Sequence, residues 1–199
     1  VIAAQTVLAL QTISSREVDP LQPVVVTVGS IHGGTKHNII PDEVVMQLTV
    51  RSYSDEVRDR TLKAIERIVK GTAAAAGVPE DRAPVVTVKD EFTPATYNTP
   101  ALVERVVPVL RRVVGDANVI QREPVMGGED FSRYGREEPK IPIFMYRLGS
   151  IPPEKMAASK KPGGKPLPSL HSAFYLPEPR ATIRTGVTTM TAAAIDLLQ

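Results

Sequence analysis

The three histidines are the side chains in this sequence best suited to hold a metal ion, and their surroundings differ. His32 and His37 lie five positions apart around a glycine-rich turn, where spacing fixes no carboxylate or third nitrogen beside them. Exposed turn histidines are the simpler interpretation of this pair. His171 stands alone in PSLHSAF, between a long loop and the last expected helix. Its spacing alone does not separate a structural histidine from a metal ligand.

The stretch VVVTVGSIHGGTKHNIIP, residues 24–41, resembles a phosphate-binding loop at first sight, because an apolar strand runs into glycines and a lysine. The spacing contradicts this. Thr35 stands where the motif requires its lysine, and Lys36 is followed by a histidine instead of Ser or Thr. Pro41 favours an extended backbone before it, so no helix N-terminus follows to hold an anion. A turn between two strands, with Gly33 and Gly34 free to adopt positive φ, fits better.

A second unusual stretch is MGGEDF, residues 126–131. Gly127 and Gly128 would allow a ligand to approach the backbone closely. Glu129 and Asp130 would begin a helix, whose dipole favours negative charge there. A ligand-binding loop and a capped helix start are both compatible with these residues, and no role follows for the two acids.

Composition excludes several classes of protein. The chain has 199 residues, 42% of them hydrophobic, and a formal net charge of +2, which gives no reason to expect a nucleic acid or membrane partner. It contains no cysteine, so disulfides and thiolate metal sites are excluded. No apolar stretch reaches the roughly 20 residues of a membrane span. The sequence leaves the cellular compartment open.

The first half of the chain predicts helix, strand, strand, helix, strand. We expect helices over 1–16 and 55–76, and strands over 22–31, 38–53 and 83–92. In the second strand, Val45, Gln47, Thr49 and Arg51 should share one face. In the second helix, Ser54 should be the N-cap and Gly77 the stop, and the buried stripe should comprise Val57, Thr61, Ile65, Ile68 and Ala73. This order is that of a ferredoxin-like split unit without its first strand, which suggests that the chain continues a longer protein.

The second half predicts a mixture of helices and short strands after a linker near 93–102. Pro108 should kink the first of these helices. We expect helices over 100–114 and 181–198, strands over 118–123 and 141–149, a glycine turn leading into a short helix over 124–135, and a surface loop over 150–169.

Three segments together resemble the aminoacylase, hippurate hydrolase and indoleacetyl-amino-acid hydrolase family of metal-dependent amidohydrolases and carboxypeptidases. They are DPLQPVVVTVGSIHGGTKHNIIPDEVVMQLTVRSY, VMGGEDFSRY and SLHSAFY, in this order. The resemblance covers essentially the whole chain. It departs locally at His32 and His37, and in the length of the loop 150–169.

The resemblance implies a fold with two parts. Residues 1–93 would form most of a ferredoxin-like dimerisation (lid) domain, and residues 94–199 the C-terminal part of a zinc-peptidase-like α/β catalytic domain. It further implies a homodimer formed through the lid. The family's first metal-binding motif, bridging acid, general-base glutamate and lid histidine would all lie upstream of this chain.

The resemblance also implies roles for individual residues. Asn38 would stabilise the oxyanion, and Arg51 would bind the substrate carboxylate, for which a planar guanidinium is well suited. The alternative for Arg51 is a surface ion pair contributing less than ~1 kcal/mol. His171 would be a metal ligand, and Gly127 and Gly128 would line the substrate pocket.

The function implied for the full-length protein is metal-dependent hydrolysis of the amide bond of N-acyl amino acids or small peptides. Two zinc ions would be expected, with Mn, Co or Ni as alternatives. A metal-bound water would give its proton to a glutamate and attack the amide carbonyl. The alternative is a non-catalytic dimerisation or interaction module. This chain alone favours that alternative, because one histidine cannot hold a two-metal site.

Overall fold

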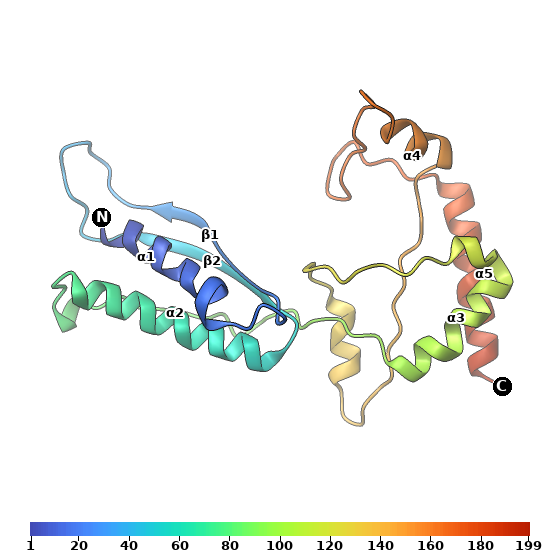
Figure 1. Ribbon diagram of the computed structural model, residues 1–199, viewed down its shortest axis with the longest axis horizontal. Helices are drawn as coiled ribbons and strands as arrows, with labels where there is room; N and C mark the ends of the chain where they lie inside the picture. The colour runs from blue at the N-terminus through green and yellow to red at the C-terminus, as the bar shows by residue number, and fades with distance from the viewer. The chain divides into compact units, whose positions relative to one another are not determined.

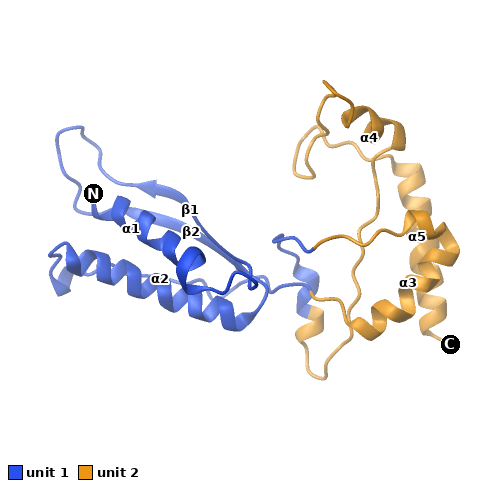
Figure 2. Ribbon diagram, in the orientation of Figure 1, with its two compact units in different colours: residues 1–96, 124–133 blue, residues 97–123, 134–199 orange.

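The computed structural model describes residues 1–199, which separate into two compact units. The first unit contains Val1–Thr96 together with Pro124–Arg133, and the second contains Tyr97–Glu123 together with Tyr134–Gln199 (Figure 2). The glycine segment MGGEDF therefore belongs with the N-terminal unit, although it follows the linker in sequence. The domain limits of 1–93 and 94–199 remain a prediction.

The first unit is built from two helices on one face of a β-hairpin (Figure 1). Helix α1 (Ile2–Thr12) continues into a π-helical turn at Ile13–Glu17, and strands β1 (Val24–His32) and β2 (Val45–Ser52) follow, then helix α2 (Asp55–Ala75). The predicted order of helix, strand, strand and helix is confirmed for these four elements.

Strands β1 and β2 pair antiparallel, with Val25 opposite Arg51 and His32 opposite Val45. Burial alternates along β2 as predicted: Met46, Leu48 and Val50 are half-buried, whereas Val45, Gln47, Thr49 and Arg51 are exposed. Strand β1 carries a bulge between Val28 and Ser30. Beyond the bulge, Ser30 lies opposite Gln47, and its hydroxyl donates a hydrogen bond to the Gln47 side-chain carbonyl at 3.0 Å.

The connection between the strands, residues 33–44, is longer than predicted, because β2 begins at Val45 and not at residue 38. The ladder starts where His32 meets Val45, and Pro41 has no N–H to extend it. Gly34 adopts a φ of 81°, which confirms the predicted positive φ for one of the two glycines.

Helix α2 has the start, stop and buried face that the sequence predicts. The Ser54 hydroxyl accepts a hydrogen bond from the Val57 amide at 3.2 Å, and Gly77 follows the helix with a φ of 78°. All five residues of the predicted stripe are buried. The core that α2 shares with α1 and β1 contains Leu10, Ile13, Val18, Val26, Val57, Ala64, Ile65, Ile68 and Val69.

The strand predicted over 83–92 does not form. Val86 still packs against the core of the first unit, while Val85 is 89% exposed. A strand exists only where another backbone satisfies its N–H and C=O groups. The sheet contains β1 and β2 alone, so residues 83–92 have no ladder partner.

The second unit contains helices α3 (Pro100–Val114), α4 (Pro153–Ser159) and α5 (Pro179–Leu197). Helices α3 and α5 confirm the two predicted long helices, and α3 continues across Pro108. Helices α3 and α5 pack together, and the Arg105 Nε of α3 forms an ion pair with the Asp196 Oδ2 of α5 at 3.1 Å. The segment predicted as a plain loop over 150–169 contains the short helix α4.

The strands predicted over 118–123 and 141–149 are absent. Residues 116–118 instead form a short 3-10 helix. The second segment bonds to the linker: the Thr99 amide donates to the Ile143 carbonyl at 2.8 Å, and the Met145 amide donates to the Asn98 side-chain oxygen at 2.8 Å. These strands were predicted from apolar runs, and without a neighbouring strand such runs do not become a sheet.

None of the helices combines the length and the apolar character required to cross a bilayer.

Candidate functional site

Arg51 occupies the exposed face of β2, one residue before the strand ends. Its Nη1 donates a hydrogen bond to the Met126 backbone carbonyl at 2.6 Å. The structure therefore brings two predicted parts of the site together, the strand arginine and the glycine loop at Gly127 and Gly128.

The backbone at Gly127 and Gly128 does not itself require glycine. Neither residue has a positive φ. A Cβ at Gly127 would lie 4.0 Å from a Val125 methyl, and one at Gly128 would lie 3.9 Å from the Thr93 methyl, both ordinary contacts. The fold would therefore accept larger residues at these two positions, and the predicted close approach of a ligand stays a prediction.

Two hydrogen bonds hold the glycine loop on residues 93–96 of the same unit. The Thr93 hydroxyl donates to an Asp130 carboxylate oxygen at 3.3 Å, and the Thr96 hydroxyl donates to the Glu129 carbonyl at 3.3 Å. Asp130 begins a 3-10 helix that extends to Arg136, so the predicted short helix is present in this tighter form. The loop is thus secured through the Asp130 side chain and the Glu129 backbone.

Phe92 provides a third attachment, which sequence analysis missed. The guanidinium carbon of Arg58 lies 4.0 Å from the centroid of the Phe92 ring, and that of Arg133 lies 5.3 Å from it. Arg133 also donates a hydrogen bond to the Phe92 carbonyl. Arg133 and Phe92 are 41 positions apart, and no periodicity or motif in the sequence links them.

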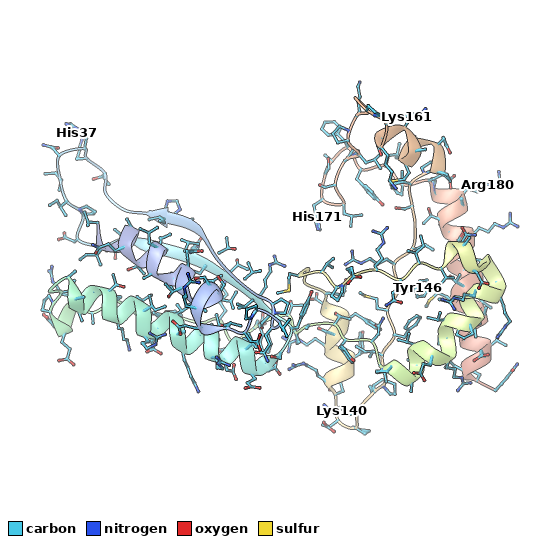
Figure 3. The ribbon with its side chains drawn as sticks, viewed as in Figure 1. His37, Lys140, Tyr146, Lys161, His171 and Arg180 are labelled. Atoms are coloured by element: carbon cyan, nitrogen blue, oxygen red, sulfur yellow. The ribbon has the colours of Figure 1, made fainter.

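Asn38 lies in the connection between β1 and β2, and its side chain is exposed without a hydrogen bond. Figure 3 labels the neighbouring His37 at the outer tip of this connection. Arg51 lies at the other end of β2, opposite Val25. The structure therefore does not bring Asn38 and Arg51 together within one chain.

His171 lies in a surface turn of the second unit (Figure 3). The turn is closed by the Ser172 amide, which donates to the Ser169 carbonyl at 3.0 Å, and the imidazole is exposed. No three His, Asp or Glu side chains converge as a metal-binding cluster anywhere in residues 1–199. The residues of this chain therefore do not fit a complete metal site, and His171 could contribute only one ligand to a larger one.

The two N-terminal histidines are also exposed. His32 is the last residue of β1 and pairs with Val45, so it belongs to the strand and not to the turn. Neither it nor His37 takes part in a cluster of metal-ligating side chains.

Comparison with known proteins identifies a peptidase dimerisation domain of the M20 type over residues 1–76. This range contains α1, β1, β2 and α2. The matched residues lie within the range 1–93 that was predicted to be a dimerisation lid.

Relatives and solved structures extend the similarity beyond this domain. Thermostable carboxypeptidase 2 of Saccharolobus solfataricus is 35% identical over 72% of this chain and 35% of its own length. An IAA-amino acid hydrolase of Arabidopsis thaliana, ILR1-like 4, is 35% identical over 69% of this chain and 31% of its own length. The crystal structure of Bacillus subtilis YxeP, described as a dinuclear metal binding peptidase of the M20 family, superposes with a TM-score of 0.67 and 24% identity over 98% of this chain and 45% of its own. The chain therefore spans about a third of the length of these curated relatives.

Proposed function

Since this chain belongs to the M20 family of peptidases and amidohydrolases, we propose that the complete polypeptide carrying it hydrolyses the amide bond of N-acyl amino acids or small peptides. Relatives named as a carboxypeptidase and as an IAA-amino acid hydrolase support this reaction class, because both cleave a bond to an amino acid that keeps a free carboxylate. The single observation in this chain that carries the proposal is Arg51, a guanidinium held on the open face of β2 beside a glycine loop.

Arg51 would bind the substrate carboxylate. A guanidinium offers five N–H donors in a planar fork, and carboxylates accept two of them in parallel. Arg51 uses Nη1 on the Met126 carbonyl, so further donors remain for a ligand. Gly127 and Gly128 follow immediately and would line the same pocket, where the absence of side chains leaves room for the ligand.

Asn38 would donate a hydrogen bond to the oxyanion that develops as the amide is attacked. A preorganised donor of this kind stabilises the transition state more than the ground state. Because Asn38 and Arg51 lie at opposite ends of β2, we propose that they serve different active sites, each one shared between the two subunits of a homodimer. The dimerisation domain over residues 1–76 supports such an arrangement.

We further propose that the complete polypeptide binds two divalent metal ions, with zinc the first candidate and Mn, Co or Ni the alternatives. The description of YxeP as a dinuclear metal binding peptidase supports the number. His171 would be one ligand, since a neutral imidazole suits these ions. The remaining ligands would come from the part of the polypeptide outside these 199 residues.

A non-catalytic dimerisation or interaction module is the second candidate, favoured by the lack of any metal-binding cluster within residues 1–199. The mass of the native protein distinguishes the enzyme from the non-catalytic module. A mass near 21.6 kDa in the source organism would identify a short protein and support the module, whereas a mass two to three times larger would support the enzyme.

The test of the proposed activity is an assay of the complete polypeptide, loaded with divalent metal, on a panel of N-acyl amino acids and dipeptides. Release of the free amino acid, measured by chromatography, is the expected result. No release from any member of the panel by folded, metal-loaded protein would reject the proposal.

A further inference from the structure

The glycine loop belongs to the same compact unit as residues 1–96, although about thirty residues separate them in sequence. Residues 124–133 are grouped with 1–96, and the contacts that hold them come from both ends of the loop. At the first end Arg51 bonds the Met126 carbonyl, and at the second Arg133 bonds the Phe92 carbonyl and lies over its ring.

Two arginines from different elements contact the Phe92 ring. Arg58 belongs to α2, so its contact with the ring joins Phe92 to the helical layer of the unit. Arg133 belongs to the 3-10 helix that follows the glycines, so its contact joins the ring to the loop. The Phe92 ring therefore contacts both α2 and the loop through the two guanidinium groups, and each cation is attracted to the face of the ring.

The hydrogen bond to the Met126 carbonyl determines the orientation of the Arg51 guanidinium. A guanidinium is planar, so a hydrogen bond at Nη1 limits rotation of the whole group and leaves its other N–H donors in a defined direction. A carboxylate that accepts two parallel hydrogen bonds requires such a fixed plane. If the loop moved away, Arg51 would keep its charge and lose its orientation.

We propose that Arg133 is a positioning residue for substrate binding. Through its hydrogen bond to the Phe92 carbonyl and its contact with the Phe92 ring, Arg133 holds the glycine loop in place. The Met126 carbonyl of that loop then orients Arg51 toward the substrate carboxylate. The proposal rests on the proposed function, since it assigns to Arg133 an effect exerted through the carboxylate-binding role of Arg51. A merely structural Arg133 would stabilise the fold and affect all substrates alike.

The first experiment uses the complete, metal-loaded polypeptide and compares Arg133→Ala and Phe92→Leu with the exposed control Arg122→Ala. For an N-acyl amino acid, Arg133→Ala and Phe92→Leu should raise KM roughly tenfold with kcat within about twofold of wild type, the pattern expected when ground-state binding is lost. For the matching N-acyl amino acid amide, KM should not change, because that substrate has no carboxylate to orient. Equal losses on both substrates would overturn the proposal.

A double-mutant cycle tests whether Arg133 acts through Arg51. Arg133→Ala should have no further effect on KM in an Arg51→Ala background, because the group it positions is already absent. Independent, additive effects would overturn the positioning role while leaving the role of Arg51 intact. If Arg51→Ala alone fails to discriminate between acid and amide substrates, the carboxylate-binding part of the proposed function is wrong instead.

Hydrogen exchange supplies a readout that does not depend on activity. Amides of residues 125–133 should exchange roughly tenfold faster in Arg133→Ala and Phe92→Leu than in wild type, since exchange reports local opening. The α3 amides of the other unit serve as the internal reference and should keep their rates. Unchanged exchange in the loop would overturn the proposal, because the contact of Arg133 with Phe92 would then not hold the loop in place.

Discussion

Asn38 and Arg51 lie on the same β-hairpin but at opposite ends of β2. Arg51 lies six positions after Val45, where β2 begins, and at about 3.3 Å per position this is roughly 20 Å along the strand. One substrate cannot reach both side chains on a straight hairpin. The two residues are therefore expected to differ in what they contribute and in which active site they serve.

Replacing Arg51 should impair binding more than turnover. Arg51→Ala in the complete polypeptide should raise KM for N-acyl amino acids roughly 10- to 100-fold, the loss typical of hydrogen bonds to a charged group, with a smaller fall in kcat. Amide and ester substrates should be nearly unaffected. Steady-state kinetics on matched substrates measure this, with the exposed Arg82→Ala as the control. Equal losses on acid and amide substrates would contradict the assigned role.

Replacing Asn38 should affect the chemical step. Asn38→Ala should lower kcat by roughly 100-fold or more with little change in KM, because an oxyanion donor acts on charge that appears only in the transition state. The side chain is exposed and makes no hydrogen bond, so the fold should tolerate the change. A variant with normal kcat would show that Asn38 is only a residue of the surface connection.

Sharing of the site between subunits can be tested by mixing two inactive variants, one lacking Asn38 and the other lacking the general base expected upstream. Mixed dimers should recover up to about a quarter to a half of the activity, since one of their two sites would then be complete. Absence of recovery, once mass spectrometry shows that subunits have exchanged, would mean that each site is built within one chain.

Enlarging the glycine loop separates a ligand-binding role from a structural one. Gly128→Ala should change the free energy of unfolding by less than about 0.5 kcal/mol, because the new methyl group makes only an ordinary contact. If the loop lines the substrate pocket, the same variant should raise KM roughly tenfold. Denaturation and kinetics measured together decide this, and Gly149→Ala, whose Cβ would meet nothing within 4 Å, is the control. Unchanged kinetics would remove the glycines from the site.

Replacing His171 should remove a metal ligand without loosening the fold. In the complete polypeptide, His171→Ala should lower the tightly bound metal from two ions per chain toward one, because one ligand is removed. The fold should remain stable, because an exposed imidazole contributes little packing. Metal analysis of the folded variant measures this, with His37→Ala as the control. Two tightly held ions in the variant would reject the assignment.

The 199-residue chain by itself should not hydrolyse hippurate or other N-acyl amino acids, even with added zinc, manganese or cobalt. It contains no cluster of three metal-ligating side chains, so it cannot hold the ions. Chelator-sensitive turnover by the purified chain, shown to be free of longer enzyme, would contradict this expectation.

Local sequence signals predicted the helices well because each signal acts within the element it defines. Ser54 caps α2, Gly77 follows its end, and the apolar period between them selects the buried face. The alternation along β2 was equally predictable, because β1 is its neighbour in sequence and supplies the ladder.

The failed strand predictions share one physical cause. Residues 83–92, 118–123 and 141–149 have strand-like composition, but pairing is a property of two segments, and the described chain offers no partner strand to any of them. In the candidate site, too, local features were predictable and contacts between distant segments were not. Arg51 and the glycines could be selected from the sequence by residue type, whereas the contact of Arg133 with Phe92 became visible only in the structure.

The bulge at Gly29 divides β1 into two parts that follow opposite alternation. Before it, odd-numbered residues such as Val25 share the solvent face with Arg51, and after it even-numbered residues such as Ser30 and His32 do so. A one-residue shift exchanges the two faces of a strand. The hairpin therefore tolerates deletions unequally along its length. Losing Gly29 would remove the bulge and leave His32 opposite Val45 and Arg51 opposite Val25. Losing a paired residue such as Ile31 would bring His32 opposite Met46, on the face toward the helices, whereas losing a residue from the 33–44 connection would leave both faces unchanged. Natural length variation in this hairpin should accordingly concentrate in the connection and at position 29, and spare the paired residues of β1.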